Sequence, residues 1–207
     1  MRKFAIFGAG GHAKVIADIL DSNGDCVEYL IDDEPKGKVI CGIKAILREE
    51  FLSIPQIQNQ VALVLAIGNN ALRKQLYEFF KSKGFDLPTI IHRSAIISKS
   101  SFLQEACVVM PQVVLNAKSQ IGVGVILNTA CVVEHDCKIG DFSHIAPRSV
   151  LCGGASVGKV SHIGANSVII EGKSVGDFCL VGAGSVVIHN IVSNKKVVGN
   201  PAKKELK

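Results

Sequence analysis

The chain has 207 residues, of which 48% are hydrophobic and 20% charged, a composition typical of a globular protein with one large or two modest domains. Its formal charge of +5 is mild, and lysines gather near the C-terminus without interleaved aromatic residues, which argues against nucleic acid as a partner. No apolar run approaches about 18 residues and the N-terminus lacks a signal-peptide pattern, so we expect no membrane insertion and a cytoplasmic location.

The first ninety or so residues alternate strand and helix patterns. The sequence "KFAIFGAGGHAKVIADIL" predicts a strand, a glycine turn and a helix, "CVEYLID" a second strand, and "VALVLAIGNN" a third strand, followed by a helix from about Ala71 to Gly84. This order of elements is typical of βαβ units and predicts a small parallel sheet of about three strands.

The glycine turn allows two kinds of ligand. "GAGGHA" fits the dinucleotide fingerprint G-x-G-x-x-A, and Asp32 and Asp33 follow about twenty residues later, so an NAD-dependent oxidoreductase is one alternative. However, three strands are about half of what a dinucleotide needs. Amides at a helix N-terminus bind the diphosphate of a nucleotide-sugar equally well. A purely structural role of the glycines in a tight turn is the third interpretation.

A six-residue period fills the second half of the sequence. Every sixth residue from Ile91 to Val187 is Ile, Leu or Val, and the residue four places later is usually small. This pattern is typical of a hexapeptide β-helix, in which three hexapeptides close one triangular coil of 18 residues. Pro88 and the onset of the period predict a boundary between two domains, residues 1–88 and 89–207.

Seven cysteines without a CxxC pair argue against both a disulfide scaffold and a cysteine zinc site, and we expect no metal. In the inward position, a thiol behaves as a compact hydrophobic group. Four cysteines occupy the small position of the repeat: Cys107, Cys131, Cys137 and Cys179.

The sequence "VEHDC" at 133–137 interrupts the repeat with charged residues. Glu134 stands where other repeats have Gly, Asn or Ala, and His135 follows at an outward corner position. A solvated surface histidine, a metal ligand and a general base are the alternatives for His135. The β-helical γ-class carbonic anhydrases use a closely spaced histidine pair that is missing here, because His144 lies nine residues away.

Stacking of the coils adds neighbours to His135. Because one coil is 18 residues, Gly153 is expected beside His135, where a backbone N–H could stabilise an oxyanion. By the same spacing His144 stacks on His162. Ala165 and Ala183 are also 18 residues apart and are expected at equivalent positions in successive coils.

The motifs "GAGGHAKVIADIL", "LIDDEP", "AIGNNALRKQL", "VILNTACVVEHDCKIGDFSHIAP" and "VVGNPAKK" resemble, over essentially the full chain, the bacterial sugar acyltransferases of the NeuD/PglD group. The resemblance implies an α/β plus all-β fold, with a small Rossmann-like N-terminal lobe and a left-handed parallel β-helix. It also implies a homotrimer with active sites between subunits. The implied activity is acetyl-CoA-dependent N-acetylation of a UDP- or GDP-linked amino-deoxy sugar for glycan biosynthesis.

The resemblance also implies roles for particular residues. His135 corresponds to the general base, and Asp136, or alternatively Glu134, orients its imidazole. Asn128 corresponds to a contact to the sugar and His144 to a contact near the thioester of acetyl-CoA, whose pantetheine arm would pass Ala165 and Ala183. The remaining residues are expected to bind the nucleotide-sugar: Gly10, Gly11, His12, Asp32, Asp33, Gly68 and Asn69.

Direct transfer in a ternary complex is expected, since no cysteine or serine stands out as an acyl-carrying nucleophile. O-acetylation of a sialic-acid-type hydroxyl is the nearest alternative, because the same base would serve it. A non-catalytic solenoid scaffold is the more remote alternative, beside the NAD-dependent oxidoreductase.

Overall fold

The computed structural model describes residues 1–205. The chain divides into two compact units, Met1–Arg93 and Ser94–Lys207. The domain boundary expected after residue 88 falls just before the last short strand of the first unit. None of the helices in residues 1–205 is long and apolar enough to cross a membrane.

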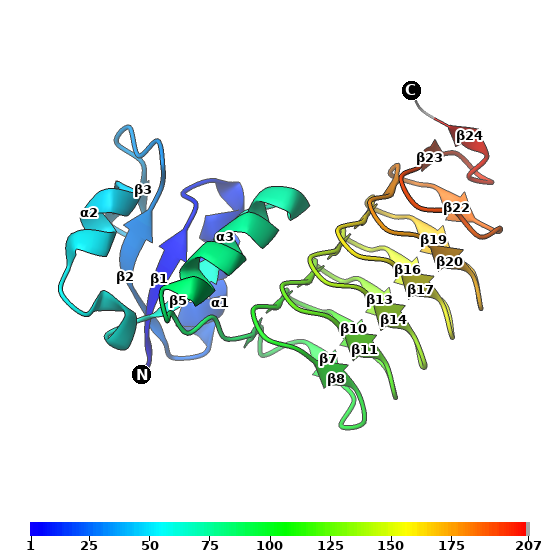
Figure 1. The fold of residues 1–207 in the computed structure, drawn as a ribbon. Coiled ribbons are helices and arrows are strands. Elements are labelled where there is room, and N and C mark those ends of the chain that lie inside the picture. Colours follow the sequence, from blue (N-terminus) through cyan, green and yellow to red (C-terminus); the bar gives the residue numbers. More distant parts are fainter. Residues whose placement is uncertain (206–207) are drawn as a thin grey trace. The chain divides into compact units, whose positions relative to one another are not determined.

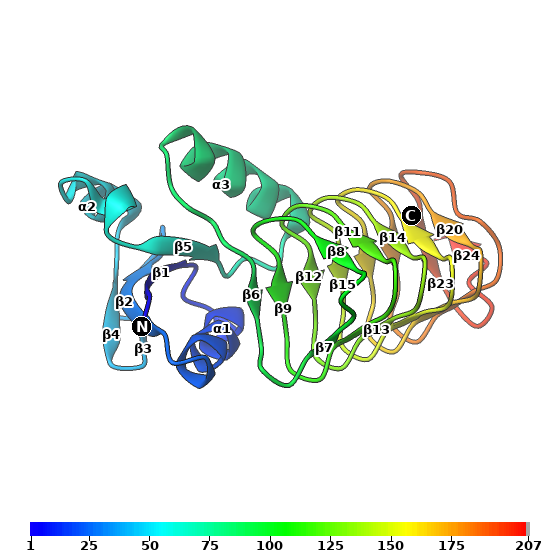
Figure 2. The same ribbon diagram turned by 90° about the horizontal axis from the view of Figure 1, so that it is seen from below.

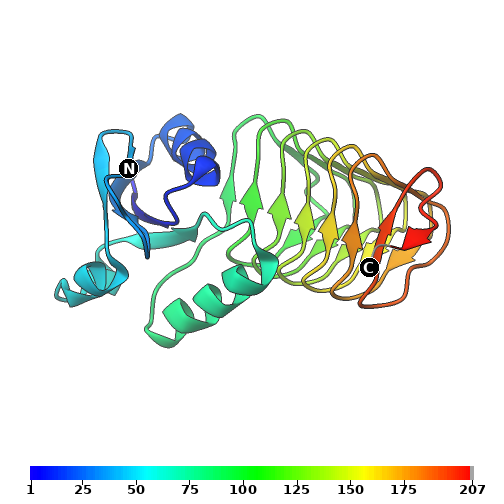
Figure 3. The same cartoon turned by 90° about the horizontal axis from the view of Figure 1, so that it is seen from above.

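The first unit is a parallel sheet flanked by helices. β1 lies between β2 and β5, and α1 and α3 cover opposite faces of the sheet (Figures 1, 2 and 3). The elements of this unit are β1 (Lys3–Phe7), α1 (Gly11–Ser22), β2 (Cys26–Ile31), β3 (Val39–Ile40), β4 (Ile43–Ile46), α2 (Arg48–Ser53), a 3-10 helix (Ile57–Asn59), β5 (Ala62–Leu65), α3 (Asn70–Ser82) and β6 (Ile90–Ile91).

The sheet has the order β3-β4-β2-β1-β5, two strands more than the sequence predicted. β3 and β4 form an antiparallel hairpin whose turn residues, Cys41 and Gly42, both have positive φ (49° and 77°). Two residues with positive φ are typical of a tight hairpin turn, and a cysteine gives no sign of one in the sequence. β3 has two residues and β4 has four, too short for a clear alternating pattern.

The second unit is a left-handed parallel β-helix. Two-residue strands stack coil upon coil into three sheets, as the repeated arrows show (Figures 1 and 2). The strands are β7 (Ile96–Ile97), β8 (Phe102–Leu103), β9 (Val108–Val109), β10 (Val114–Leu115), β11 (Gln120–Ile121), β12 (Ile126–Leu127), β13 (Val132–Val133), β14 (Lys138–Ile139), β15 (His144–Ile145), β16 (Val150–Leu151), β17 (Ser156–Val157), β18 (His162–Ile163), β19 (Val168–Ile169), β20 (Ser174–Val175), β21 (Leu180–Val181), β22 (Val186–Val187), β23 (Lys196–Val198) and β24 (Lys204–Glu205).

The core of the β-helix contains the six-residue series of branched side chains. From Val109 to Val187 every member of that series is buried, and so are the four cysteines expected beside them. The hydroxyl groups of buried serines donate hydrogen bonds to carbonyl groups of the next coil. The hydroxyl of Ser149 donates to the carbonyl of Gly164 (2.8 Å) and that of Ser167 to Gly182 (2.9 Å). The small position therefore tolerates a polar group because a carbonyl of the next coil accepts its hydrogen bond.

From residue 106 to residue 184, each corner of the β-helix contains a residue in the left-handed backbone conformation. Positive φ recurs at every sixth residue from Ala106 to Gly184, including Asp136 (60°) and the β-branched Val160 (57°). Such residues are disfavoured in isolation. The repeat imposes them because each corner must turn the chain through the same angle to keep successive strands in register.

Candidate active site

The segment "VEHDC" forms the corner between β13 and β14. His135 and Asp136 are exposed at this corner, whereas Cys137 points into the core. Asp136 takes the left-handed conformation that the corner requires, which aspartate tolerates better than most residues. The register of the repeat thus places the imidazole outside the core, accessible to a substrate.

His135 and Asp136 are hydrogen-bonded to each other. Nδ1 of His135 lies 2.8 Å from Oδ2 of Asp136. A carboxylate only accepts hydrogen bonds, so Nδ1 carries the proton and Nε2 keeps a free lone pair. The two side chains are 63% and 58% exposed, which leaves Nε2 within reach of a ligand. This is the arrangement of a base whose tautomer and orientation are fixed by a carboxylate.

Glu134 ties the same corner to the preceding coil. Its Oε2 accepts a hydrogen bond from Nδ2 of Asn116 (2.9 Å), and its carbonyl accepts one from the hydroxyl of Ser119 (2.6 Å). Of the two acids that the sequence offers as partners of His135, Asp136 is the one in contact within residues 1–205. Asn116 was not singled out by the sequence, although its position 18 residues before Glu134 is a signal for this contact.

Gly153 lies directly against the imidazole. A β-carbon added at Gly153 would come within 2.6 Å of Nε2 and 2.7 Å of Cε1 of His135, closer than atoms can pack. The N–H of Gly154 donates to the carbonyl of His135 (2.9 Å) and so belongs to the coil ladder. The N–H of Gly153 donates to no acceptor in the described part of the chain. The residue packed against the imidazole thus has a backbone N–H that the coil does not use.

A second group of expected site residues lies at the corner between β12 and β13 and on the strands that stack next to β12. Nδ2 of Asn128 is 2.9 Å from Nε2 of His144 on β15. The rings of His144 and His162 meet edge to face with their centroids 4.8 Å apart. Ala165 follows β18 and Ala183 follows β21, so the two alanines occupy the same corner position in successive coils. Within one chain, the structure does not bring this group together with His135 and Gly153.

The thiols around these corners are poor nucleophiles. Burial raises the pKa of Cys131 to about 12 and that of Cys137 to about 11. Burial also raises the pKa of Cys152, beside Gly153, with the carboxylates of Glu171 and Glu134 adding to the shift. A thiolate is the reactive form of cysteine, so the environment disfavours an acyl-cysteine intermediate at this site.

In the first unit, the expected ligand residues gather at the carboxyl edge of the sheet. Asp32, at the end of β2, accepts hydrogen bonds from the N–H groups of Ala9 and Glu34 (2.8 Å each) and pairs with Lys38 (2.9 Å). Burial raises the pKa of Asp32, but the hydrogen bond from Glu34 and the contacts with Lys38 and Ala9 outweigh it and hold the pKa below its ordinary value. Asp32 thus joins the turn after β1 to the end of β2.

Asp33 lies on the rim of a small cavity at the same edge. Both its oxygens pair with the guanidinium of Arg48, which lies over the rings of Phe7 and Phe79, 5.1 and 5.4 Å from their centroids. The cavity has a volume of about 250 Å³, and the residues lining it are Phe7, Gly8, Asp32, Asp33, Glu34, Lys38, Ile67 and Leu72. Sequence reasoning missed Arg48, because α2 carried no recognisable pattern.

The glycine turn and the "IGNN" turn supply the other expected contacts. Gly10 and Gly11 have open space around them, and Gly11 begins α1. Asn69 caps α3, since its Oδ1 accepts from the N–H of Leu72 (3.0 Å), and the Gly68 carbonyl faces Arg73 (3.4 Å). Asn69 therefore has a structural role whether or not it contacts a ligand.

His12 is uncharged at neutral pH. Burial, and then the positive charge of Arg73, lower the pKa of His12 to about 4. Its Nε2 is buried and has no hydrogen-bond partner among residues 1–205. A buried ring nitrogen without a partner is costly in an unliganded protein and indicates a place for a ligand atom.

Comparison with known proteins decides the family. The chain is 36% identical to GDP-perosamine N-acetyltransferase from Caulobacter crescentus, covering 98% of this chain and 96% of that one, with a TM-score of 0.93. The chain belongs to the NeuD/PglD group of sugar acyltransferases. Residues 3–80 match the family model of the PglD N-terminal domain.

Two further members of the group are similar. The acetyltransferase domain of PglB from Neisseria gonorrhoeae, solved with acetyl coenzyme A, is 36% identical, with 98% of each chain covered and a TM-score of 0.92. UDP-N-acetylbacillosamine N-acetyltransferase of Bacillus subtilis is 36% identical over 114 residues, which are 53% of this chain and 52% of that protein. The Caulobacter enzyme was solved with CoA and GDP-perosamine, in a form with one histidine replaced by alanine.

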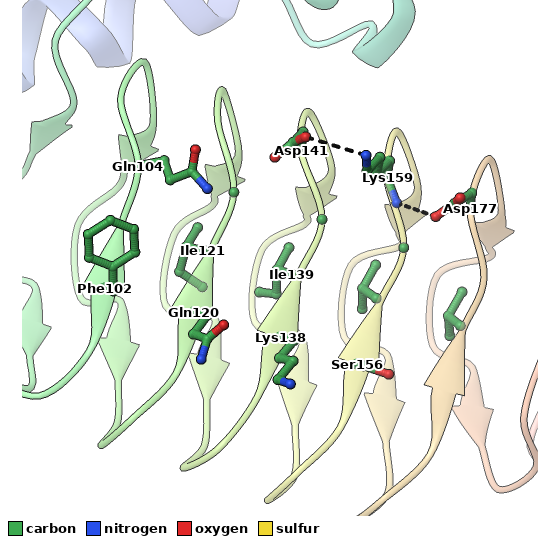
Figure 4. Close-up of a pocket in the computed structure, with 15 residues that line it drawn as sticks. Phe102, Gln104, Gln120, Ile121, Lys138, Ile139, Asp141, Ser156, Lys159 and Asp177 are labelled. Atoms are coloured by element: carbon green, nitrogen blue, oxygen red, sulfur yellow. Dashed lines mark hydrogen bonds and ion pairs between the residues drawn. The ribbon is translucent and has the colours of Figure 1, made fainter.

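A wide groove on this NeuD/PglD-type β-helix contains none of the expected site residues. It has a volume of about 470 Å³ and runs across β8, β11, β14, β17 and β20 (Figure 4). Its rim contains an ion pair between Lys159 and Asp141 (3.9 Å), and the Lys159 N–H donates to Asp177 (2.7 Å). Asp177 and Asp141 each accept a backbone N–H of the preceding coil, so this rim has a structural function.

Proposed function

We propose that this protein is an acetyl-CoA-dependent N-acetyltransferase of a nucleotide-linked amino-deoxy sugar, a UDP- or GDP-4-amino sugar, in surface glycan or glycoprotein biosynthesis. The observation that carries the proposal is the His135–Asp136 pair, with Nε2 of His135 free and Gly153 against it. The named activities of the Caulobacter and Bacillus relatives support the substrate class. The CoA ligands of the related structures support the acyl donor.

Catalysis proceeds by direct transfer. The lone pair of the sugar amine attacks the thioester carbonyl carbon, and Nε2 of His135 takes a proton from the amine nitrogen. The carbonyl electrons move to the oxygen, and the N–H of Gly153 stabilises this oxyanion. When the oxyanion collapses, the C–S bond breaks and the imidazolium returns its proton to the leaving thiolate. Asp136 stabilises the imidazolium between the two proton transfers.

The nucleotide part of the acceptor binds to the first unit. Gly10, Gly11 and His12 face the diphosphate at the N-terminus of α1, where backbone N–H groups and the helix dipole favour anions. The side of the base, next to the 250 Å³ cavity, is formed by Asp32, Asp33, Gly68 and Asn69. Asp32 already holds Ala9 and Lys38, which disfavours the ribose contact of an NAD enzyme.

A thiol-release assay tests the reaction. The protein should release CoA from acetyl-CoA in the presence of one UDP- or GDP-linked 4-amino sugar and give the N-acetylated sugar by mass spectrometry. Turnover on free sialic acid alone would move the activity to O-acetylation. If no acceptor leads to release of CoA and the protein does not bind acetyl-CoA, the proposed function is wrong and a scaffold is favoured.

The active unit is a homotrimer whose sites lie between subunits, in the cytoplasm. One sheet of the β-helix lies between the corner with Asn128 and the corner with His135. The outward residues of its strands are all aliphatic: Ile96, Val114, Val132, Val150, Val168 and Val186. An aliphatic stripe of this length is typical of a surface covered by a partner. A threefold arrangement through this face lets the corner with His135 meet a neighbour's corner with Asn128 and His144. All seven cysteines are free, as in a reducing compartment.

Mixing inactive variants tests the shared site. We expect His135→Ala and His144→Ala subunits to be nearly inactive alone, and mixed trimers from equal amounts to regain about a quarter of the normal turnover, because a site then takes one intact residue from each neighbour. Refolding each variant with itself is the control. If the mixture stays as inactive as the separate variants, both residues act from the same chain and the shared site is wrong.

A further inference from the structure

Two turns of the first unit meet at the carboxyl edge of its sheet. β1 and β5 are parallel neighbours, and the N–H of Ala66 donates to the carbonyl of Phe7 (2.7 Å). The turns are in close contact, because a β-carbon at Gly8 would come within 2.8 Å of Ile67 Cδ1. The helices that follow, α1 and α3, lie on opposite faces of the sheet (Figure 3). This topological switch point is where open α/β sheets bind their ligands.

Arg73 is a buried cation at this point. Its side chain is in the first turns of α3 and the residue is only 1% exposed. Nη1 donates to the carbonyl of Ile67 (3.0 Å), and Nη2 donates to Oδ1 of Asn70 (2.9 Å). Because the guanidinium spans these acceptors, it holds the turn between β5 and α3 in one shape. An arginine stays protonated even when buried, so the positive charge is permanent.

The charge of Arg73 acts on His12 in the first turn of α1. After burial, Arg73 is the second cause of the low pKa of His12. Asp32, at the end of β2, contacts Ala9, Glu34 and Lys38. A neutral imidazole with a buried Nε2 offers a hydrogen bond without adding a titrating charge. Lys38 and Arg48 at this edge are paired with Asp32 and Asp33. Arg73 adds a buried positive charge, and His12 offers the directed contact.

We propose that Arg73 is a positioning residue of the nucleotide-sugar pocket, whose buried guanidinium holds the Ile67–Asn70 turn and provides the permanent positive charge that selects a diphosphate beside His12. This inference rests on the proposed function, since it concerns the same pocket. It adds a residue from α3 to a site otherwise built on the glycine turn before α1. It also explains why a charged side chain occupies the apolar face of α3, in register with Leu76 and Phe80.

Two substitutions separate the charge from the shape. Arg73→Met removes both the charge and the hydrogen bonds, whereas Arg73→Lys keeps the charge but loses the two-sided contact. Lys74→Met is the matched control, because it removes a charge from the exposed face of the same helix. Affinity for UDP and GDP is measured by calorimetry near pH 8, where the terminal phosphate is fully ionised. The His12 imidazole is titrated by NMR and assigned with His12→Gln.

For the nucleotide that the unaltered protein binds, we expect Arg73→Met to lose about tenfold or more in affinity, Arg73→Lys to lose less, and Lys74→Met to lose nothing. The pKa of His12 should rise in Arg73→Met and stay low in Arg73→Lys. Equal weakening of both variants with an unmoved His12 titration would reduce Arg73 to a structural residue and overturn the proposal. If Arg73→Met does not fold, a loss above about tenfold in a folded Arg73→Lys overturns it, and a smaller loss with a low His12 pKa supports it.

The failures of the two proposals look different. If the unaltered protein binds neither UDP nor GDP, the proposed function fails and the role of Arg73 fails with it. If the unaltered protein binds one of them and Arg73→Met binds it equally well, only the role of Arg73 is wrong.

Discussion

Replacing His135 by alanine should lower kcat by about a hundredfold to ten-thousandfold with little change in the affinity for acetyl-CoA. The side chain is exposed and contacts Asp136 rather than the core, so the substitution removes the base without leaving a cavity. The measurement is steady-state thiol release with the nucleotide-amino sugar, together with calorimetry of acetyl-CoA. The affinity for acetyl-CoA separates a lost base from a lost binding site.

His189 offers a matched control for this substitution. It occupies the same outward corner position three coils later and is exposed as well. His189→Ala should therefore keep normal turnover. If His135→Ala retains a kcat within about threefold of normal, a general base at this position is wrong and another group must take the amine proton.

Replacing Gly153 by alanine should lower kcat by about tenfold to a hundredfold without unfolding the protein. A β-carbon there would overlap Nε2 and Cε1 of His135, so the imidazole must move from its place beside Gly153. The exposed imidazole is free to swing outward, whereas the backbone of the coil is held by its ladder of hydrogen bonds. The fold should therefore be preserved while the base is displaced, which kinetics and thermal unfolding measure separately.

A double substitution tests whether Gly153 acts through His135. If the clash is the cause, His135→Ala with Gly153→Ala should be no slower than His135→Ala, because residues that act as a unit are not additive. Additional loss in the double variant would assign Gly153 an independent contribution, such as the position of its N–H. Normal turnover of the single Gly153→Ala variant would contradict the close packing at this corner.

The six-residue period was sufficient to predict the β-helix, because one side chain per hexapeptide must enter a core of constant width. It also predicted which cysteines are buried, and it predicted that Gly153 lies beside His135 in the next coil. The hairpin of β3 and β4 and the short α2 were missed, since elements of two to six residues show too little periodicity. Arg48, which α2 contributes as the partner of Asp33 at the rim of the 250 Å³ cavity, was missed with them.

Arg73 shows a different limit of sequence reasoning. The spacing of Arg73, Leu76 and Phe80 marks the buried face of α3, so the pattern alone indicates a buried position. What the pattern omits is the set of acceptors that makes a buried cation tolerable. That the carbonyl of Ile67 accepts a hydrogen bond from Arg73 is known only from the folded structure, because it depends on the shape of the turn before α3.

For the candidate site, the sequence by itself determined which residues share a corner and which lie one coil apart, because a constant period of 18 residues converts directly into stacking. Only the tertiary structure decided that Asp136 holds Nδ1 of His135, while Asn116 of the preceding coil holds Glu134. It likewise decided that the Gly154 N–H is used by the coil and the Gly153 N–H is not. The physical reason is that the preceding coil, 18 residues away in the chain, brings Asn116 to Glu134 and leaves Asp136 as the carboxylate that contacts His135.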